Sequence, residues 1–386
     1  MKKIFNKVLL SASVLGLLAG CAGEEDNVIM APVPQVKNQL SSETQWSASI
    51  GSGVGDYFSQ LTPNYNYDKV FVADRDGLVK ALDPKTGDTL WETDLEGDTS
   101  ARLSGGIAAA YGQIYIGSEN GRVIALDEKT GKQVWSQPVD GEVLATPATD
   151  SNLVLVNTSR GTLIALDQKT GKQEWVINTE VPTLTLRGDS QPVAFSGGVF
   201  WGTPSGRLAA AVVERGQLIW QHPIGKPKGA TEIDRLVDVD SSPLLVGSTL
   251  YTVGYNGQLV AMDLRSGNPI WKRNYSSSEN IATDGSSIFL VTDNDHLVAV
   301  DARSGTELWK NKKLENRLVT APVMINGYVV VGDSQGYLYW IDRETGKFVA
   351  EQNIDSSGLA ISPITVDNGY VVVTRDGSVK KLTIKQ

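Results

Sequence analysis

Apolar and polar residues alternate with a period of two over short stretches of this chain, and tight turns separate the stretches. In Gly121–Trp135, Val123 and Ala125 alternate with their neighbours at a period of two, and a turn runs from Asp127 to Gly131. Alternation of this kind is typical of a β-strand. An Asp side chain can accept hydrogen bonds from the backbone amides that follow it, and Gly can adopt positive φ. The stretch therefore predicts a β-hairpin.

The same hairpin recurs along almost the whole chain. Units begin at Gly77, Gly121, Gly161, Gly206, Gly257, Asp295, Gly336 and Gly377, about 43 residues apart on average. Two further short strands precede each hairpin, as in Ala321–Met324 and Gly327–Gly332. A repeat of four strands at this period is typical of a propeller blade, and one four-stranded sheet must stack on neighbours to bury both faces. The sequence predicts an all-β, eight-bladed β-propeller of four-stranded antiparallel blades.

A tryptophan stands near the end of most units, at Trp91, Trp135, Trp175, Trp220, Trp271 and Trp309. An aromatic side chain of this size buries about 150–250 Å² between packed sheets, so we interpret these residues as core. The seventh unit departs from the pattern. It has Ala350 where Trp is expected and Trp340 where most other units have Ala, which suggests that one gap is filled from the opposite side.

The eighth unit is incomplete, because the chain ends at Gln386 before a Trp-bearing strand. The segment Gln45–Ile50, which contains Trp46, resembles the strands that begin at Trp91 and Trp135. We therefore expect the N-terminal strand around Trp46 to be the outermost strand of the eighth blade. This arrangement closes the ring and leaves no long unpaired edge at the seam.

The first twenty residues have the pattern of a secretory signal peptide. A basic segment with Lys2, Lys3 and Lys7 precedes an apolar run over Val8–Leu18, which is too short to span a membrane stably. Leu18-Ala-Gly-Cys21 resembles a bacterial lipobox, in which the cysteine is lipidated. The alternative is an ordinary signal peptide followed by an unrelated cysteine.

The division of the chain follows from these segments: a signal peptide over 1–20, a lipidated Cys21 with a flexible, solvated tether over 21–41, and the propeller over 42–386. Cys21 is the single cysteine, which excludes a disulfide within the chain. Ala22, rather than Asp, follows it, and by resemblance to lipoprotein sorting this predicts the periplasmic face of the outer membrane.

Composition and charge exclude some classes of function. The chain has 386 residues, of which 41% are hydrophobic and 20% charged, as in folded proteins. Its formal net charge is −9, and removal of the signal peptide's three lysines makes it about −12. Nucleic-acid binding requires a basic surface, so we expect no nucleic-acid partner.

Two consecutive connections between blades are longer than the others. From the repeat Trp to the Pro of the next blade there are 12 residues at Trp135–Pro147, but 17 at Trp175–Pro192 and 23 at Trp220–Pro243. Both long connections join the outer strand of one blade to the inner strand of the next. They should therefore emerge side by side on the same face, and excess loop length often marks function.

The content of the two connections predicts a protein-binding patch. The first contains Leu184, Leu186 and Arg187, and the second contains Arg235, Asp238 and Asp240. Apolar residues beside charges that set register are typical of protein interfaces. The alternative is that Leu184, Leu186 and Leu236 pack under the loops while the charges are merely solvated.

These features together resemble the BamB family, the propeller lipoproteins of the outer-membrane β-barrel assembly (BAM) complex. The lipobox, the eight Trp-bearing units and the segments Leu184–Gly188 and Glu232–Asp240 carry the resemblance. It implies a non-enzymatic accessory protein that binds the periplasmic POTRA domains of the central barrel subunit BamA and assists folding and insertion of β-barrel proteins. It places the contact on Leu184, Leu186, Arg187, Asp238 and Asp240, and leaves room for other BAM subunits and unfolded outer-membrane proteins as partners.

Two other functions remain open at this point. Quinone-dependent (PQQ-type) dehydrogenases share the Trp repeat, but many carry adjacent cysteines and a Ca²⁺ site. This chain has one cysteine and two histidines, His222 and His296, and Asp293-Asn-Asp295 lacks the pattern of a calcium loop. We therefore expect no catalytic residues, no cofactor and no metal. The other possibility is a general periplasmic chaperone or scaffold that binds substrate strands at an exposed sheet edge.

Overall fold

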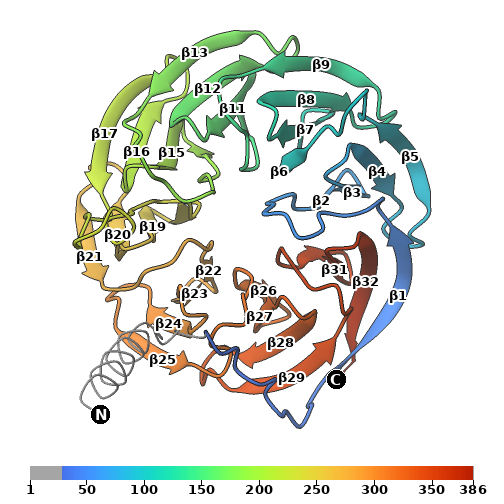
Figure 1. Cartoon of the computed structure of the whole chain (residues 1–386), viewed down its shortest axis with the longest axis vertical. Helices are drawn as coiled ribbons and strands as arrows, with labels where there is room; N and C mark the ends of the chain where they lie inside the picture. The colour runs from blue at the N-terminus through green and yellow to red at the C-terminus, as the bar shows by residue number, and fades with distance from the viewer. Residues whose placement is uncertain (1–27, 386) are drawn as a thin grey trace, which may run out of the picture.

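The computed structural model describes residues 28–385, which form eight four-stranded antiparallel sheets arranged as blades around a central axis (Figure 1). The predicted eight-bladed propeller is confirmed. The predicted signal peptide and Cys21 lie outside the described residues. Within residues 28–385, no helix is long and apolar enough to cross a membrane.

The strands follow one another from the axis outward in each blade. Blade one contains β2 (Asn64–Asn66), β3 (Lys69–Ala73), β4 (Leu78–Leu82) and β5 (Thr89–Asp94); blade two β6 (Leu103–Ala110), β7 (Gln113–Ser118), β8 (Arg122–Asp127) and β9 (Gln133–Pro138); blade three β10 (Ala148–Asp150), β11 (Leu153–Thr158), β12 (Thr162–Asp167) and β13 (Gln173–Asn178); blade four β14 (Val193–Phe195), β15 (Gly198–Thr203), β16 (Arg207–Val212) and β17 (Gln217–Pro223). Blade five contains β18 (Leu244–Val246), β19 (Thr249–Thr252), β20 (Leu259–Asp263) and β21 (Pro269–Arg273); blade six β22 (Ala282–Thr283), β23 (Ser287–Val291), β24 (Leu297–Asp301) and β25 (Glu307–Asn311); blade seven β26 (Val323–Ile325), β27 (Tyr328–Gly332), β28 (Tyr337–Asp342) and β29 (Phe348–Asn353); blade eight β30 (Ile364–Val366), β31 (Gly369–Val373), β32 (Ser378–Lys385) and β1 (Ser41–Ser49).

The N-terminal strand closes the ring, as the sequence predicts. In blade eight the order of the strands is β1-β32-β31-β30, with β1 outermost and antiparallel to the C-terminal strand. Trp46 pairs with Lys381, and its indole Nε1 donates to the carbonyl of Pro84 in blade one at 3.0 Å. The two ends of the chain therefore share one sheet, which is joined to blade one by the same contact that joins other blades.

Each repeat Trp locks its blade to the hairpin turn of the next blade. Trp135 Nε1 donates to the carbonyl of Gln168 at 2.9 Å, and its ring lies against Gly171. Gly171 has a φ of +72°, and a Cβ there would lie 2.6 Å from the indole, so the turn requires glycine for both reasons. The same ring-on-glycine contact occurs in the pairs Trp46–Gly87, Trp91–Gly131, Trp175–Gly216, Trp220–Gly267, Trp271–Gly305 and Trp309–Gly346.

Blade seven lacks this Trp because blade eight has no turn to receive it. In blade eight the third strand and the outer strand come from opposite ends of the chain, so no hairpin joins them. Ala350 stands directly opposite Trp340 in the β28–β29 register, the reverse of the Ala–Trp pairing in other blades. Trp340 is fully buried and packs edge-on against Tyr370 of blade eight. The predicted exchange is therefore a compensation.

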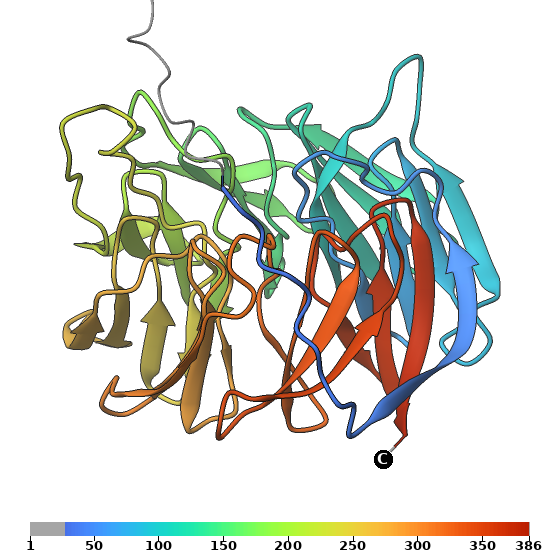
Figure 2. The same ribbon diagram turned by 60° about the horizontal axis from the view of Figure 1, so that its bottom comes forward.

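Successive strands are antiparallel, which gives the ring two different faces (Figure 2). One face carries the connections between blades and the turns between second and third strands; we call it the loop face. The opposite face carries the other two turns of each blade, including the Asp-to-Gly turns, and we call it the turn face. The long connections, residues 179–192 and 224–243, both belong to the loop face.

Residues 29–40 do not form the solvated tether that their composition predicts. They run along blade seven, and we call them the strap. At one end Ala31 N donates to the carbonyl of Glu315, and at the other Gln39 N donates to the carbonyl of Val349 in β29. Leu40 is buried beside Trp340. Sequence composition misses this because an extended segment of Pro and polar residues can still bind through its backbone.

Replacement of Trp340 by Ala tests the exchange in blade seven. A fully buried Trp leaves a large cavity when truncated, so we expect Trp340→Ala to destabilise the protein by about 3–5 kcal/mol. The matched control, Trp309→Ala, removes a Trp that is only partly buried and should cost less. Urea denaturation followed by tryptophan fluorescence measures both. Equal midpoints for the two variants would contradict the role given to Trp340.

Candidate partner-binding site

The two long connections lie against each other on the loop face, as predicted. The backbone amide of Leu186 faces the carboxyl group of Asp238. Gly188 packs so closely on Asp240 that a Cβ there would lie 2.7 Å from its carboxyl group. Ser190 Oγ donates to the carbonyl of Ser241 at 3.1 Å. The connections therefore form one surface and not two independent loops.

Three buried carboxyl groups form the floor of this surface. Asp238 and Asp240 are only 2% and 5% exposed, and Asp189 from the first connection is buried beside them. Burial raises the pKa of all three carboxyl groups, and the charge of Asp240 raises the pKa of Asp189 and Asp238 further. Burial beside another carboxyl group therefore favours the neutral form at this floor.

The burial of Asp238 and Asp240 changes the role that the sequence suggests for them. A partner that approaches the loop face cannot reach either carboxyl group while the first connection covers them. Val239 N donates to Asp238 Oδ1 at 2.9 Å, and Leu144 N donates to Asp189 Oδ2 at 3.3 Å. Asp189 and Asp238 therefore bond to the backbone beneath this surface.

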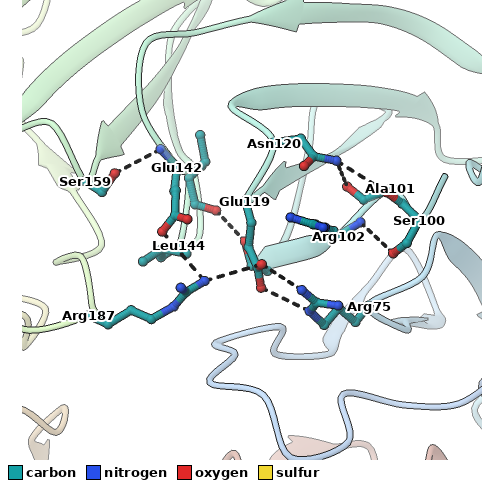
Figure 3. A network of polar contacts seen from close by, with 12 residues as sticks. Arg75, Ser100, Ala101, Arg102, Glu119, Asn120, Glu142, Leu144, Ser159 and Arg187 are labelled. Carbon is teal, nitrogen blue, oxygen red and sulfur yellow. Dashed lines mark hydrogen bonds and ion pairs between the residues drawn. The ribbon is translucent and has the colours of Figure 1, made fainter.

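Arg187 reaches across the loop face to carboxylates of two other segments (Figure 3). Its Nη2 lies 3.4 Å from Glu119 Oε2, in the turn between β7 and β8, and 3.7 Å from Glu142 Oε2, between β9 and β10. These distances exceed the 2.7–2.9 Å of a strong charge-assisted hydrogen bond. Its side chain is 48% exposed, so the guanidinium is oriented but keeps donors for an incoming acceptor.

Glu119 is held mainly by a different arginine. Arg75, in the turn between β3 and β4, binds it through two hydrogen bonds of 2.8 and 3.1 Å (Figure 3). The guanidinium of Arg75 also stacks on Tyr57, 3.8 Å from the centre of the ring. Glu119 therefore has its charge compensated without Arg187, and a partner carboxylate can draw Arg187 away at little cost.

Both connections also carry apolar side chains, some of them exposed. Leu184 is 46% exposed and Ile233 is 69% exposed, whereas Leu186 and Leu236 are half-buried. A surface pocket of about 250 Å³ opens between the two connections. It is lined by Pro182, Thr183, Leu184, Pro227, Glu232, Arg235, Leu236 and Val237. The alternative in which all three leucines pack under the loops does not hold for Leu184, and Leu186 and Leu236 remain partly exposed.

Arg235 stands at the rim of this pocket on a short turn. Thr231 N donates to Asp234 Oδ2 and Asp234 N donates to Thr231 Oγ1, both at 3.1 Å, so the turn is closed by reciprocal side-chain caps. Arg235 N then donates to the carbonyl of Thr231 at 3.2 Å. The arginine side chain is exposed on a turn whose backbone is fixed.

Sequence reasoning missed the residues that orient Arg187. Arg75, Glu119 and Glu142 come from blades one to three, and nothing in their local sequence marks them, because they meet Arg187 only when the ring closes. A third long connection, residues 50–63 at the seam, also escaped notice, since its length is visible only once β1 is placed in blade eight. It carries the exposed Tyr57 and Phe58.

The two histidines and Asp295, which lie outside this surface, have structural partners. His222 packs on Trp220 with ring centres 5.1 Å apart, and His296 Nε2 lies 3.1 Å from Glu315 Oε1. Asp295 accepts hydrogen bonds from the amides of Leu318 and Val319. In the part of the chain that the structure describes, no group of His, Cys, Asp and Glu residues could hold a metal ion.

Comparison with known proteins gives the same description repeatedly. The family model described as outer membrane protein assembly factor BamB matches residues 75–311 and 294–386. Outer membrane protein assembly factor BamB of Vibrio cholerae is 67% identical over 386 residues and covers 100% of both chains. The protein of that name from Escherichia coli is 43% identical over 392 residues, covering 99% of each chain.

Solved structures resemble the ring at two levels of similarity. The crystal structure of BamB from Moraxella catarrhalis superposes with a TM-score of 0.79 at 27% identity, covering 89% of this chain and 99% of that chain. Quinohemoprotein alcohol dehydrogenase from Comamonas testosteroni gives a TM-score of 0.71 at 15% identity, covering 88% of this chain and 76% of that chain. The second likeness concerns the fold alone.

The buried carboxyl groups predict how stability depends on pH. Because their pKa is raised, Asp238 and Asp240 keep their protons in the folded state at pH values where the unfolded state has lost them. The free energy of unfolding therefore decreases as the pH rises above the ordinary carboxyl pKa. We expect the thermal midpoint of the wild type to fall more steeply between about pH 5 and about pH 9 than that of Asp238→Asn, Asp240→Asn. The exposed Asp140→Asn is the control, and parallel curves for all three proteins would contradict the prediction.

Proposed function

The chain belongs to the BamB family of outer membrane protein assembly factors, and from this premise we propose that it binds the periplasmic POTRA domains of the barrel subunit BamA through the loop-face site. It is an accessory protein of outer-membrane protein assembly and not an enzyme. Binding at this site places the propeller beside the machinery that folds and inserts β-barrel proteins. The proposed location is the periplasmic face of the outer membrane, through lipid on Cys21.

One observation carries the proposal: two long connections pack into a single surface that exposes apolar side chains from both connections and a loosely paired arginine. Leu184 and Ile233 offer area that a partner can remove from water, at about 25 cal/mol per Å². Arg187 offers donors in a fixed fork that matches a carboxylate. An apolar centre with an arginine is the composition typical of interface hot spots.

The rigid floor under the patch supports the same function. A loop that orders only on binding lowers affinity, because each immobilised side chain costs about 0.5–1.5 kcal/mol. Here the backbone around Leu186–Gly188 is already fixed by Asp238 and Asp240. We propose direct contact for Leu184, Leu186, Arg187 and Arg235, and a positioning role for Asp238 and Asp240.

The partner site is tested by a binding measurement in detergent solution. We expect Leu186→Ala, Arg187→Ala to weaken binding to purified BamA POTRA domains at least tenfold, which corresponds to about 1.4 kcal/mol, because both the apolar contact and the ion pair are removed. Titration calorimetry measures the affinity, and the thermal midpoint shows whether the variant remains folded.

A matched control for this measurement is available on the same face. Arg160 is an exposed arginine in the turn between β11 and β12. Its Nε lies 3.4 Å from Oδ1 of Asp140, which follows β9. Arg160→Ala removes the same charge from the loop face without touching the two connections. Equal affinity for the wild type and a folded Leu186→Ala, Arg187→Ala variant would refute the proposed site, and equal losses in this variant and Arg160→Ala would reduce it to a non-specific charge effect.

A further inference from the structure

The first described strand enters the ring from the turn face. Like every outer strand, β1 runs toward the loop face, so Ser41 lies at the turn face and residues 50–63 continue across the loop face. A chain that left the ring freely at Ser41 would connect any N-terminal anchor to the turn face. That face is the one opposite the partner-binding site.

The strap reverses this exit. From Leu40 toward Ile29, the strap runs along the outer edge of blade seven, antiparallel to β29. It reaches the loop face between blades six and seven (Figure 2). Asn38 exchanges two hydrogen bonds of 2.9 Å with the backbone of Glu351, and Gln39 N donates to the carbonyl of Val349 at 2.8 Å. The C-terminal part of the strap is therefore hydrogen-bonded to β29, the outer strand of blade seven.

The N-terminal end of the strap binds to residues 315–317, in the connection between blades six and seven. Ala31 N donates to the carbonyl of Glu315 at 2.9 Å, and Asn316 Nδ2 donates to the carbonyl of Ile29 at 3.0 Å. Arg317 Nη1 donates to the carbonyl of Ala31 at 2.7 Å. Because this connection belongs to the loop face, the strap ends on the same face as Arg187.

Arg317 is also held by side chains of the ring, independently of the strap. Arg317 is 1% exposed. Its Nε donates to Asp333 Oδ2 at 2.7 Å, and its Nη2 donates to Gln335 Oε1 at 2.7 Å. The charge is compensated inside the ring, and the remaining donor points at the strap carbonyl. A preorganised donor of this kind costs no side-chain entropy when the strap docks.

We propose that the strap directs the lipid anchor to the loop face, so that the surface around Asn316–Leu318 faces the phospholipid of the membrane. Eight residue steps lead from Ile29 back to Cys21, and at no more than about 3.6 Å each they reach at most about 29 Å. Ile29 and Leu318, the latter 68% exposed, offer apolar side chains at this point. The inference rests on the proposed function in one respect, the lipid on Cys21.

The consequence is that anchor and partner site share one face of the ring. A partner bound at Arg187 is then held on the membrane side of the propeller, where the periplasmic domains of a membrane-embedded barrel lie. Without the strap, the anchor would leave from Ser41 with a reach of about 70 Å at the same rise per residue, and the ring would have no fixed orientation.

The orientation is measured with single fluorescent labels on the lipidated protein in phosphatidylethanolamine and phosphatidylglycerol vesicles. Acylation blocks the thiol of Cys21, the single cysteine, so Leu318→Cys on the loop face and Phe195→Cys on the turn face each introduce one free thiol. Both side chains are exposed. With a quencher attached to the lipid headgroups, we expect quenching at position 318 to exceed that at position 195 several-fold. Equal quenching at the two positions would overturn the orientation.

A strap-release variant tests the cause. Ala31→Pro, Asn38→Ala and Asn316→Gly together remove hydrogen bonds of the strap without altering the core of the ring, because glycine tolerates the positive φ of residue 316. We expect the quenching ratio to fall toward one, while trypsin cleavage at the exposed Lys37 accelerates and the thermal midpoint of the ring stays nearly unchanged. Faster cleavage with an unchanged quenching ratio would show that the strap does not orient the ring.

The two proposals fail in distinguishable ways. A mass spectrum without acyl chains on Cys21 contradicts the anchor and with it this inference. Partner binding in detergent does not involve the membrane, so the affinity of the Leu186→Ala, Arg187→Ala variant reports on the partner site alone. The strap-release variant keeps that site intact, and we expect it to bind the POTRA domains in detergent as the wild type does.

Discussion

The contact between a tryptophan and the glycine turn of the next blade is the interaction on which the ring depends. Indole Nε1 donates to a turn carbonyl at 2.8–3.0 Å in six of these contacts, from Trp46, Trp91, Trp135, Trp175, Trp271 and Trp309. The indole lies against a glycine of that turn, and the absence of a Cβ on the glycine makes room for the indole. A large apolar surface and a satisfied polar atom are thus buried together, and the contact sets the spacing of the blades.

The seam shows what happens where this contact is impossible. Blade eight is assembled from both ends of the chain and has no hairpin turn between its last two strands, so a Trp on blade seven would have nothing to dock on. In blade seven, Trp340 of β28 instead fills the space that a Trp at position 350 of β29 would occupy. The strap covers the outer edge of blade seven. The closure of the ring by both ends of the chain thus removes a turn, and the exchange of Trp340 and Ala350 follows from that absence.

The proposed partner-binding surface combines a fixed floor with exposed side chains. Asp189, Asp238 and Asp240 are buried and hold two connections together, while Arg187 is oriented by Glu119 and Glu142 at distances too long for strong bonds. Rigidity beneath and loose pairing above both favour association, because neither the backbone nor the arginine has to be reorganised at high cost.

The sequence by itself determined the fold, because a repeat with period-two strands, Asp-to-Gly turns and a spaced Trp has few ways to bury its surfaces. It also determined the closure around Trp46 and the pair of long connections. Only the tertiary structure decided that Asp238 and Asp240 are buried, that Arg187 meets Glu119, and that residues 29–40 bind blade seven. Local pattern records which face of its own strand a residue occupies. Which distant segment covers a loop residue depends on how the ring closes, and that information is absent from any single repeat.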